Sequence, residues 1–315
     1  MQVYPLKLKP AVKEIIWGGD KLKTAYGKEA PFEKLAESWE LTVRPDGMNV
    51  IENGEYAGMT LGEYIENAGN SVIAAGYDAD RFPLLIKFID ARDRLSIQVH
   101  PSDDYALANE NEYGKTEVWY IVEADEGAEL VFGLSRDYTK EAFDKAVAEN
   151  TVETLLNRVK VQKGDVYFIP SGLVHAIGAG ILICEIQQNS NTTYRVYDYN
   201  RRDKDGNLRP LHVAKALEVS CLQKSPDLPA TPDGADVLLA ACEYFEVRRL
   251  RVNGETTVTA DESSFVSLMV TDGEGTLTYA DGELSFTKGD SLFIPAQNAA
   301  FTITGQCELI QSKVN

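Results

Sequence analysis

Two histidines stand at the ends of predicted β-strands, beside other residues that could bind a metal ion. His100 follows the alternating run 95–99, and Gln98 lies two residues before it. Because successive side chains of a strand point to opposite faces, Gln98 and His100 should share a face and Val99 should point the other way. A second alternating strand ends in a Pro-Ser-Gly turn that delivers His175. Two imidazoles placed in this way suggest a single site inside a β-barrel.

Glu117 opens a further β-type run and would add a carboxylate to this group. An amide oxygen, two imidazoles and a carboxylate suit Zn²⁺ or a similar divalent ion. Taken singly, a buried histidine is more often a hydrogen-bonded structural residue than a ligand, and Glu117 could be a solvated strand residue. Together, Gln98, His100, Glu117 and His175 predict one metal site. The third histidine, His212, lies at a predicted helix start and is assigned no chemistry.

The bulk composition argues against several classes of partner. With 31 Lys and Arg against 49 Asp and Glu, the formal net charge is −18, which would repel nucleic acid and anionic membrane surfaces. No run approaches the roughly 18 apolar residues of a transmembrane helix, and the first residues lack the apolar core of a signal peptide. The four cysteines form no C-x-x-C pair, which indicates reduced thiols in a cytoplasmic protein. A small phosphorylated substrate is compatible with this charge if basic residues gather locally.

Short β-type runs separated by Gly, Asp, Asn and Pro dominate the chain, which is typical of a sandwich or barrel. Helical patterns are few and short. We therefore expect a mainly β fold with a few short helices. The predicted strands are 82–88, 95–99, 118–122, 166–170 and 181–186, and the predicted helices are 61–67, 140–150 and 210–219.

An internal repeat suggests two barrels of related design. Residues 163–170, Lys-Gly-Asp-Val-Tyr-Phe-Ile-Pro, align with residues 288–295, Lys-Gly-Asp-Ser-Leu-Phe-Ile-Pro. Continuing the alignment puts Ala300 opposite His175, so we expect the metal site in the first barrel alone. Prolines at positions 226, 229 and 232 favour a linker. The expected domains are 1–223, a catalytic barrel with helical insertions, 224–236, a Pro-rich linker, and 237–315, a C-terminal barrel without a metal site.

Residues 164–175 resemble the second cupin signature, Gly-x5-Pro-x-Gly-x2-His, except that Ala179 replaces its final Asn. The first signature normally reads His-x-His with a Glu soon after, whereas here Gln98 takes the first position and Glu117 follows an inserted segment. The chain resembles the type I mannose-6-phosphate isomerases of the short bacterial kind, a cupin branch with this departure. The motifs that carry the resemblance span most of residues 1–220 and are Ile16–Gly19, Glu37–Glu40, Pro83–Lys87, Leu95–Pro101, Gly114–Glu117, His175 with Glu185, Tyr194–Asp198 and Arg209–Ala216.

This resemblance implies two cupin-type jelly-roll barrels and the interconversion of mannose 6-phosphate and fructose 6-phosphate. In that reaction a proton moves between C2 and C1 through a cis-enediol. The resemblance also implies one Zn²⁺ per chain, or another divalent ion, which would act as a Lewis acid. The expected partner is a small phosphorylated sugar, with no nucleic acid and no membrane. The expected state is a monomer or weak homo-oligomer in the cytoplasm.

Three ionisable residues are candidates for the chemistry itself. Arg195, which stays protonated, would stabilise developing negative charge. Lys115 lies two residues before Glu117 and hence near the metal, where a lysine should be easier to deprotonate and could act as a base. Glu185 is the carboxylate alternative. The sequence does not choose among Lys115, Glu185 and a metal-bound hydroxide.

Three more residues are expected to contact the substrate: Lys87, Trp17 and Ser96. Lys87 lies in an apolar strand, where a solitary ammonium is costly unless it faces a polar cavity. Lys87 and Lys115 are both candidates for phosphate contact or proton transfer. Trp17 would close part of the cavity, and the inserted polar segment 102–114 should cover one side of the site.

Two rival functions remain open at this point. An iron-dependent cupin dioxygenase would typically use more histidines, and Gln98 here takes a position usually held by one. A non-catalytic sugar-binding double cupin would bind carbohydrate without turnover. The clustering of ionisable residues around the metal motif counts against that second rival.

Overall fold

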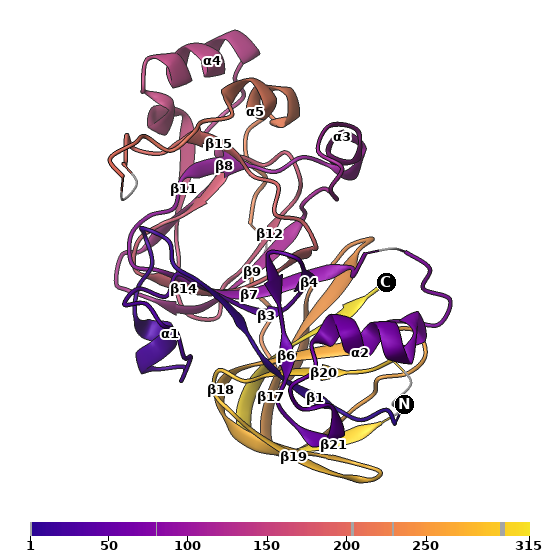
Figure 1. Cartoon of the computed structure of the whole chain (residues 1–315). Coiled ribbons are helices and arrows are strands. Elements are labelled where there is room, and N and C mark those ends of the chain that lie inside the picture. Colours follow the sequence, from indigo (N-terminus) through magenta and orange to yellow (C-terminus); the bar gives the residue numbers. More distant parts are fainter. Residues whose placement is uncertain (1, 80, 203–204, 229, 297–299) are drawn as a thin grey trace. The chain divides into compact units, whose positions relative to one another are not determined.

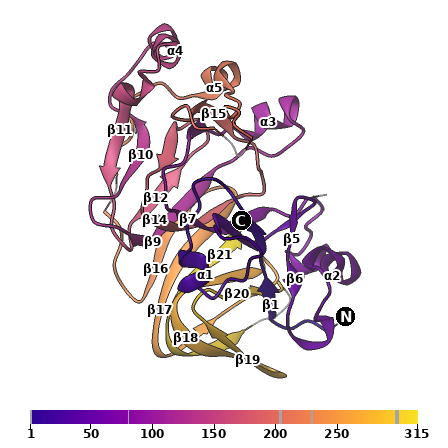
Figure 2. The ribbon, with the colours of Figure 1, turned by 60° about the vertical axis from the view of Figure 1, so that its left-hand side comes forward.

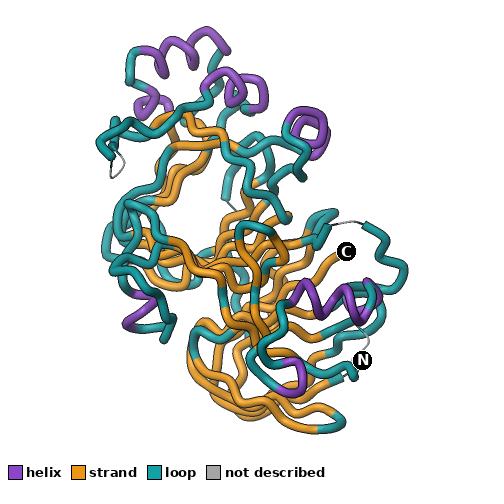
Figure 3. Tube along the Cα trace, in the orientation of Figure 1, coloured by secondary structure: helices purple, strands orange, loops and turns teal. Residues whose placement is uncertain are grey.

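The computed structural model describes residues 2–79, 81–202, 205–228, 230–296 and 300–315 and divides into two compact units (Figure 1). Unit 1 comprises Met1–Lys13, Asp20–Phe88 and Thr231–Asn315, and unit 2 comprises Glu14–Gly19 and Ile89–Ala230. Strands dominate both units, which confirms the mainly β fold (Figure 3). Within the described ranges, no helix is long and apolar enough to cross a membrane.

This division differs from the predicted domain boundaries, because residues 20–88 belong with the C-terminal strands. Pairing between distant segments links them: β6 (Val50–Ile51) pairs with strand β1 (Leu6–Lys9), and β1 pairs with β20 (Ser291–Ile294), with Leu6 opposite Phe293. Local composition contains no signal for such a pairing. Part of the expected linker, Pro229, lies outside the described residues.

Unit 1 is built on a large antiparallel sheet of order β16-β17-β21-β18-β20-β1-β6, with β19 added beside β18. Figure 2 shows its long curved strands β17 and β18. Their apolar side chains form one core with Phe286, Leu292 and Phe301. The remaining bounds are β2 Ala11–Lys13, β3 Glu37–Leu41, β4 Val43–Arg44, β5 Gly47–Met48, β6 Val50–Ile51, β16 Asp236–Ala241, β17 Phe245–Val258, β18 Val266–Tyr279, β19 Gly282–Thr287 and β21 Phe301–Val314, with helices α1 Lys21–Thr24 and α2 Leu61–Ala68 and 3-10 turns Gly54–Tyr56 and Asn70–Val72.

The two copies of the internal repeat adopt the same local conformation. Gly164 and Gly289 each have a φ of 95°, a left-handed value that favours glycine, and each precedes a short strand. The strands that follow are β12 (Val166–Ile169) and β20. Beyond them the copies differ, since His175 begins strand β13 whereas Ala300 immediately precedes β21.

Unit 2 is built from two sheets. One has the order β11-β10-β13-β8-β15, and the other includes β12, β9 and β14 as neighbours. Ring contacts join their inner faces, with Phe132 and Tyr167 at 5.9 Å and Trp119 and His175 at 5.3 Å between centroids. The hydrogen bonding does not close into a continuous barrel, so the architecture is a two-sheet jelly roll. The bounds are β8 Ile97–Val99, β9 Glu117–Ala124, β10 Glu129–Leu134, β11 Leu156–Lys160, β13 His175–Ile177, β14 Ile181–Gln188 and β15 Tyr194–Tyr197, while β7 Leu84–Ala91 leads from unit 1 into unit 2.

Helices cover the outer face of the first sheet. Strand residues Ile97, Val99 and Val196 form one apolar cluster with Phe143 of α4 (Lys140–Ala148) and Ala216 of α5 (Val213–Val219). In Figure 1, α4 and α5 lie beside β8, β11 and β15. The outward position of Val99 confirms the alternation expected for this strand, because Gln98 is left on the opposite face.

The predicted elements are largely present, with one omission. Helices α2, α4 and α5 lie within one to three residues of the predicted bounds, and α2 begins with a capping box in which Thr60 and Glu63 bond each other's backbone. The segment 102–114 contains helix α3 (Asp103–Asn109), whereas the sequence predicted only a polar covering. Two acidic residues in its first turn favour that helix through its dipole.

Replacing Phe143 by alanine tests whether α4 supports the sheet. Phe143 is fully buried, so Phe143→Ala should lower the free energy of unfolding by about 3–5 kcal/mol. Phe168→Ala is the matched control, since Phe168 is 37% exposed and should lose less than half as much. Urea unfolding followed by circular dichroism measures both, and equal losses would contradict the packing described.

Candidate functional site

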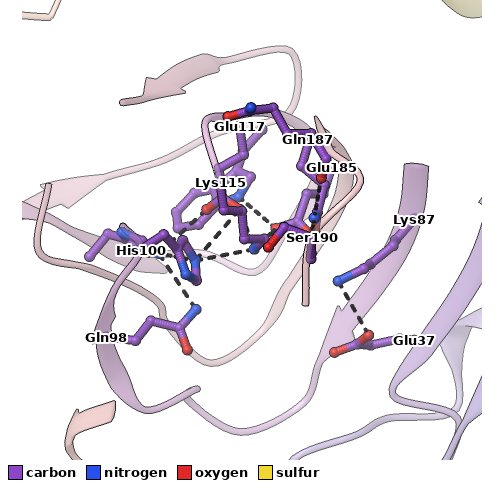
Figure 4. A network of polar contacts seen from close by, with 12 residues as sticks. Glu37, Lys87, Gln98, His100, Lys115, Glu117, Glu185, Gln187 and Ser190 are labelled. Atoms are coloured by element: carbon purple, nitrogen blue, oxygen red, sulfur yellow. Dashed lines mark hydrogen bonds and ion pairs between the residues drawn. The ribbon is translucent and has the colours of Figure 1, made fainter. Parts of the chain in front are cut away.

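Three buried side chains of metal-ligating type meet inside unit 2 (Figure 4). His100, Glu117 and His175 offer ligand atoms that all lie within 4.8 Å of one another. The two histidine Nε2 atoms are 3.1 Å apart, and His175 Nε2 lies 3.4 Å from Glu117 Oε1. The side-chain nitrogen of Gln98 lies 3.5 Å from His175 Nε2. The structure therefore brings together the four residues predicted as ligands.

Backbone pairing explains this meeting. Gln98 of β8 and His175 of β13 are direct partners across two neighbouring strands, and Glu117 begins β9 in the other sheet. The turn before His175 is tied to the first strand, because Gly172 N donates to His100 O at 2.8 Å. Gly172 has a φ of 87°, which explains why the turn contains glycine at this position.

Both imidazoles are held by backbone carbonyl groups at their Nδ1 atoms. His100 Nδ1 lies 2.9 Å from Thr192 O, and His175 Nδ1 lies 2.7 Å from Leu173 O. A carbonyl oxygen only accepts, so each Nδ1 carries the proton when the ring is neutral. Burial lowers the pKa of His175 to about 3, which keeps its ring neutral at ordinary pH. Both Nε2 lone pairs then face the same small space.

This donor set fits a divalent metal ion. Two Nε2 lone pairs 3.1 Å apart repel one another unless a cation or a proton lies at them. Glu117 Oε1 is buried beside them and has no hydrogen-bond partner among the described residues. The amide group of Gln98 reaches the same place and can present its oxygen by a half-turn. Nitrogen and oxygen ligands of this kind are those of zinc and other borderline divalent ions.

The ammonium group of Lys115 touches the same cluster. Lys115 Nζ donates to Glu117 Oε2 and lies 3.1 Å from His100 Nε2 and 3.8 Å from Glu185 Oε1. Burial raises the pKa of Glu117 above its usual range, and Glu185 adds to that rise while Lys115 opposes it. The Glu117 carboxylate is thus acted on by an ammonium and a second carboxylate in opposite directions.

Trp119 is part of this site and was missed by the sequence reasoning. Its indole Nε1 donates to Glu185 Oε1 at 3.0 Å, and its ring packs edge-on against His175. Trp119 lies two residues after Glu117 in the same strand, so the period of two that placed Gln98 beside His100 could have found it.

Arg195 lies next to the predicted ligands in the sheet, since it is the direct partner of Gln98 between β15 and β8. Its Nη1 donates to Pro210 O at 2.8 Å, and its Nε is buried without a hydrogen-bond partner among the described residues. Burial lowers the pKa of Arg195 from its ordinary value, although an arginine so shifted stays charged.

Arg195 belongs to a group of three arginines around one aspartate. Asp198 forms ion pairs with Arg201 and, at 3.3 Å, with Arg209, and the electrostatic influence of Arg201 reaches both Arg195 and Arg209. Asp93 also lies 3.9 Å from Arg201, so three arginines face two carboxylates and this part of an acidic chain keeps a local excess of positive charge. Of these three arginines, the sequence analysis assigned a chemical role to Arg195 alone and named Arg209 only as part of a motif.

Lys87 is buried in β7 within unit 1, as its apolar strand suggested. Its Nζ lies 3.7 Å from Glu37 Oε2 (Figure 4). The same carboxylate oxygen accepts a 2.7 Å hydrogen bond from Trp39 Nε1. The ammonium is thus compensated by a carboxylate. Its contact with substrate stays a prediction.

The other sequence-predicted residues occupy ordinary positions in unit 2. Trp17 is buried and its carbonyl accepts a bond from Asp93 N, while Ser96 Oγ donates to Gln98 Oε1 at 3.4 Å. Contact of Trp17 and Ser96 with substrate stays a prediction. His212 is the N-cap residue of α5, and its Nδ1 accepts a bond from the backbone of β15, so it has a structural partner.

Comparison with known proteins identifies the family. A model of the phosphomannose isomerase type I catalytic domain matches residues 5–144, and a model of the mannose-6-phosphate isomerase cupin domain matches residues 236–314. Mannose-6-phosphate isomerase ManA of Bacillus subtilis is 39% identical over 99% of both chains. The chain belongs to the type I phosphomannose isomerases. This membership and the His-Glu-His cluster both suggest a bound metal.

A further relative and two solved structures are similar to this chain. The mannose-6-phosphate isomerase of Streptococcus mutans is 37% identical over 99% of this chain and 98% of its own. The crystal structure of the mannose 6-phosphate isomerase from Bacillus subtilis superposes with a TM-score of 0.90 at 39% identity, covering 99% of both chains. A putative mannosephosphate isomerase structure from Archaeoglobus fulgidus shares the fold, with a TM-score of 0.82 at 20% identity over 100% of this chain and 98% of its own.

Metal analysis of freshly purified protein tests the cluster. We expect about one divalent ion per chain, and His175→Ala should remove it because the variant lacks a central nitrogen ligand. His212→Ala is the control, since His212 lies outside the cluster and its loss should leave the metal content unchanged. Retention of the ion by His175→Ala would refute the site, and two tightly bound ions would contradict a single site per chain.

Proposed function

We propose that the chain interconverts mannose 6-phosphate and fructose 6-phosphate through a cis-enediol. The observation that carries this proposal is the buried His100–Glu117–His175 cluster with Lys115 and Glu185 beside it. The Bacillus subtilis relative, 39% identical over 99% of this chain, is a mannose-6-phosphate isomerase, which supports the same substrate here. Neither rival function has a specific observation in its favour.

The proposed metal is one Zn²⁺ per chain, held by Gln98, His100, Glu117 and His175. Three or four protein ligands of this kind leave room for a substrate oxygen. When bound, the ion supplies Lewis-acid polarisation of substrate oxygens and stabilises the negative charge that develops on them. Neutral His175 and an ionised Glu117 are the forms that bind a cation, so metal binding would oppose the effect of burial, which raises the pKa of Glu117.

Lys115 and Glu185 are the proposed proton-transfer residues. Their charged groups are 3.8 Å apart, so a proton taken up by one can be passed on or balanced by the other. Trp119 holds Glu185 Oε1 in place, and Glu117 holds the Lys115 ammonium. The Lys115 side chain that donates to Glu117 is protonated, and a protonated amine cannot accept a further proton. Glu185 is therefore the stronger candidate for taking the proton from C2 or C1.

The arginine group supports a phosphorylated substrate. Arg195, Arg201 and Arg209 around Asp198 give a local excess of positive charge in a chain whose formal net charge is −18. An anionic sugar phosphate would otherwise be repelled by that overall charge. Arg195, with its unsatisfied Nε, is proposed to stabilise the enediolate.

Lys87, Trp17 and Ser96 are proposed as substrate contacts on the strength of the motifs to which they belong. Burial of Lys87 and Trp17 agrees with an enclosed position for both, and Ser96 is linked to Gln98. The cytoplasmic location and the monomer or weak homo-oligomer remain expectations from composition and resemblance.

A coupled assay for fructose 6-phosphate, with and without a chelator, tests the activity. Metal-replete protein should convert mannose 6-phosphate, and exhaustive chelation should abolish the conversion because the ligand cluster then holds no Lewis acid. Restoring the divalent ion should restore the rate. Absence of product with metal-replete protein would end the proposal.

In the same assay Arg195→Ala should lower kcat by about a hundredfold, the scale for losing one group that stabilises an oxyanion. Arg92→Ala is the matched control, since Arg92 is exposed and has no assigned part in the reaction. An unchanged kcat in Arg195→Ala would remove Arg195 from the mechanism while leaving the reaction itself intact.

A further inference from the structure

Two polar residues outside the proposed site are joined to the backbone that carries Lys115 and Glu117. We propose that Asp103 and Gln188 form a hydrogen-bond clamp that positions these two side chains, and that both are positioning residues for the isomerase reaction. The inference rests on the function proposed above. The clamp consists of the Asp103 carboxylate, the Gln188 side chain and the two backbone N–H groups that they bind.

The orientation of the Gln188 amide is determined by its partners. Gln188 is 4% exposed, and its Nε2 donates to Asp103 Oδ1 and Oδ2 at 3.0 and 3.2 Å. Its Oε1 accepts from Thr116 N at 2.9 Å. A carboxylate only accepts and a backbone N–H only donates, so reversing the amide would lose both interactions at once.

The clamp forms hydrogen bonds with the backbone on both sides of Lys115. Asp103 Oδ1 accepts from Gly114 N at 2.7 Å, and Gln188 Oε1 holds Thr116 N, while Lys115 N itself donates to Pro101 O at 3.0 Å. Three successive backbone N–H groups are therefore bound from outside the strand. Side chains two residues apart share a face, so this backbone aims Lys115 and the following ligand into the cluster together.

Close packing leaves this segment little freedom to shift. A Cβ atom added to Gly114 would lie 2.4 Å from Asp103 N and 2.5 Å from Ser102 C, closer than any real contact. Glycine is required here because the chain passes directly against the start of α3. The clamp therefore holds a backbone already pressed against the residues that bind it.

The other end of the network reaches a histidine of the cluster. Gln188 O accepts from Ser190 N at 2.7 Å, and Ser190 Oγ accepts from Thr192 N at 3.2 Å. Thr192 O in turn holds His100 Nδ1 at 2.9 Å. Gln188 thus connects the Lys115 backbone with the carbonyl that orients one imidazole, and outer-shell partners of this kind tune metal affinity and activity.

An exchange of the two side-chain types tests the clamp. Asp103→Asn keeps the Oδ1 acceptor but replaces Oδ2 by an N–H₂ group that faces the donor Gln188 Nε2, so it weakens the contact. Gln188→Glu places two carboxylates against each other and breaks the contact. The double variant Asp103→Asn/Gln188→Glu restores a donor facing an acceptor, keeps an acceptor for Thr116 N and leaves the net charge unchanged. Asp104→Asn, at the exposed neighbouring position, is the control for charge loss.

We would measure kcat, KM and the rate at which a chelator removes metal from each holoenzyme. Gln188→Glu should lose about tenfold or more in kcat, with a smaller change in KM, and should release metal faster. Asp103→Asn, which keeps the Oδ1 contact, should change in the same direction by a smaller factor. The double variant should return to within about threefold of the parent in both measurements, and Asp104→Asn should stay within about twofold.

A Gln188→Glu variant that matches Asp104→Asn, or a double variant no better than Gln188→Glu, would overturn the clamp. If a single variant fails to fold, the comparison between the double variant and Asp104→Asn still decides the outcome. If the parent protein does not isomerise the sugar phosphate, the proposed function fails, while the rates of metal release still test the clamp.

Discussion

The site depends on one constraint: two imidazole nitrogens and a carboxylate oxygen share a small buried space. Each histidine is turned by a backbone carbonyl, so both Nε2 lone pairs point inward and lie 3.1 Å apart. Such an arrangement is repulsive without positive charge between or beside its members. The Lys115 ammonium and the metal suggested by the family would both supply this positive charge. Glu117 accepts a hydrogen bond from the ammonium and is also one of the possible metal ligands.

The rest of unit 2 supplies the rigidity that this repulsion requires. Gln98, His175 and Arg195 stand on three adjacent strands in direct register, while Glu117 and Trp119 face them from the second sheet. Apolar side chains on the outer face of the first sheet are buried under α4 and α5. A ligand strand held on one face by packing and on the other by hydrogen bonds has few alternative positions.

Charge is distributed unevenly in a way that agrees with an anionic substrate. A chain with a formal net charge of −18 places three arginines around Asp198 and puts Lys115 between two buried carboxylates. Lys115 and its two carboxylates are buried and the three arginines are half-buried, so solvent screens these charges less than it screens those of the exposed surface. The composition gives only the net charge of the whole chain and does not show where the charges lie.

Local patterns in the sequence were sufficient for the strand that carries Gln98 and His100, for the strand and glycine turn before His175, and for the family, because period and turn chemistry act over a few residues. The partners that close the site could not be read in this way. Trp119 on Glu185, Arg201 and Arg209 on Asp198, and Gln188 on Asp103 join residues whose meeting depends on strand register. The same holds for β1, which pairs with β20 from the far end of the chain. Sequence determined which side chains are present and which face of a strand they occupy, whereas tertiary structure decided which of them touch, because contact between distant segments is set by the packing of whole sheets.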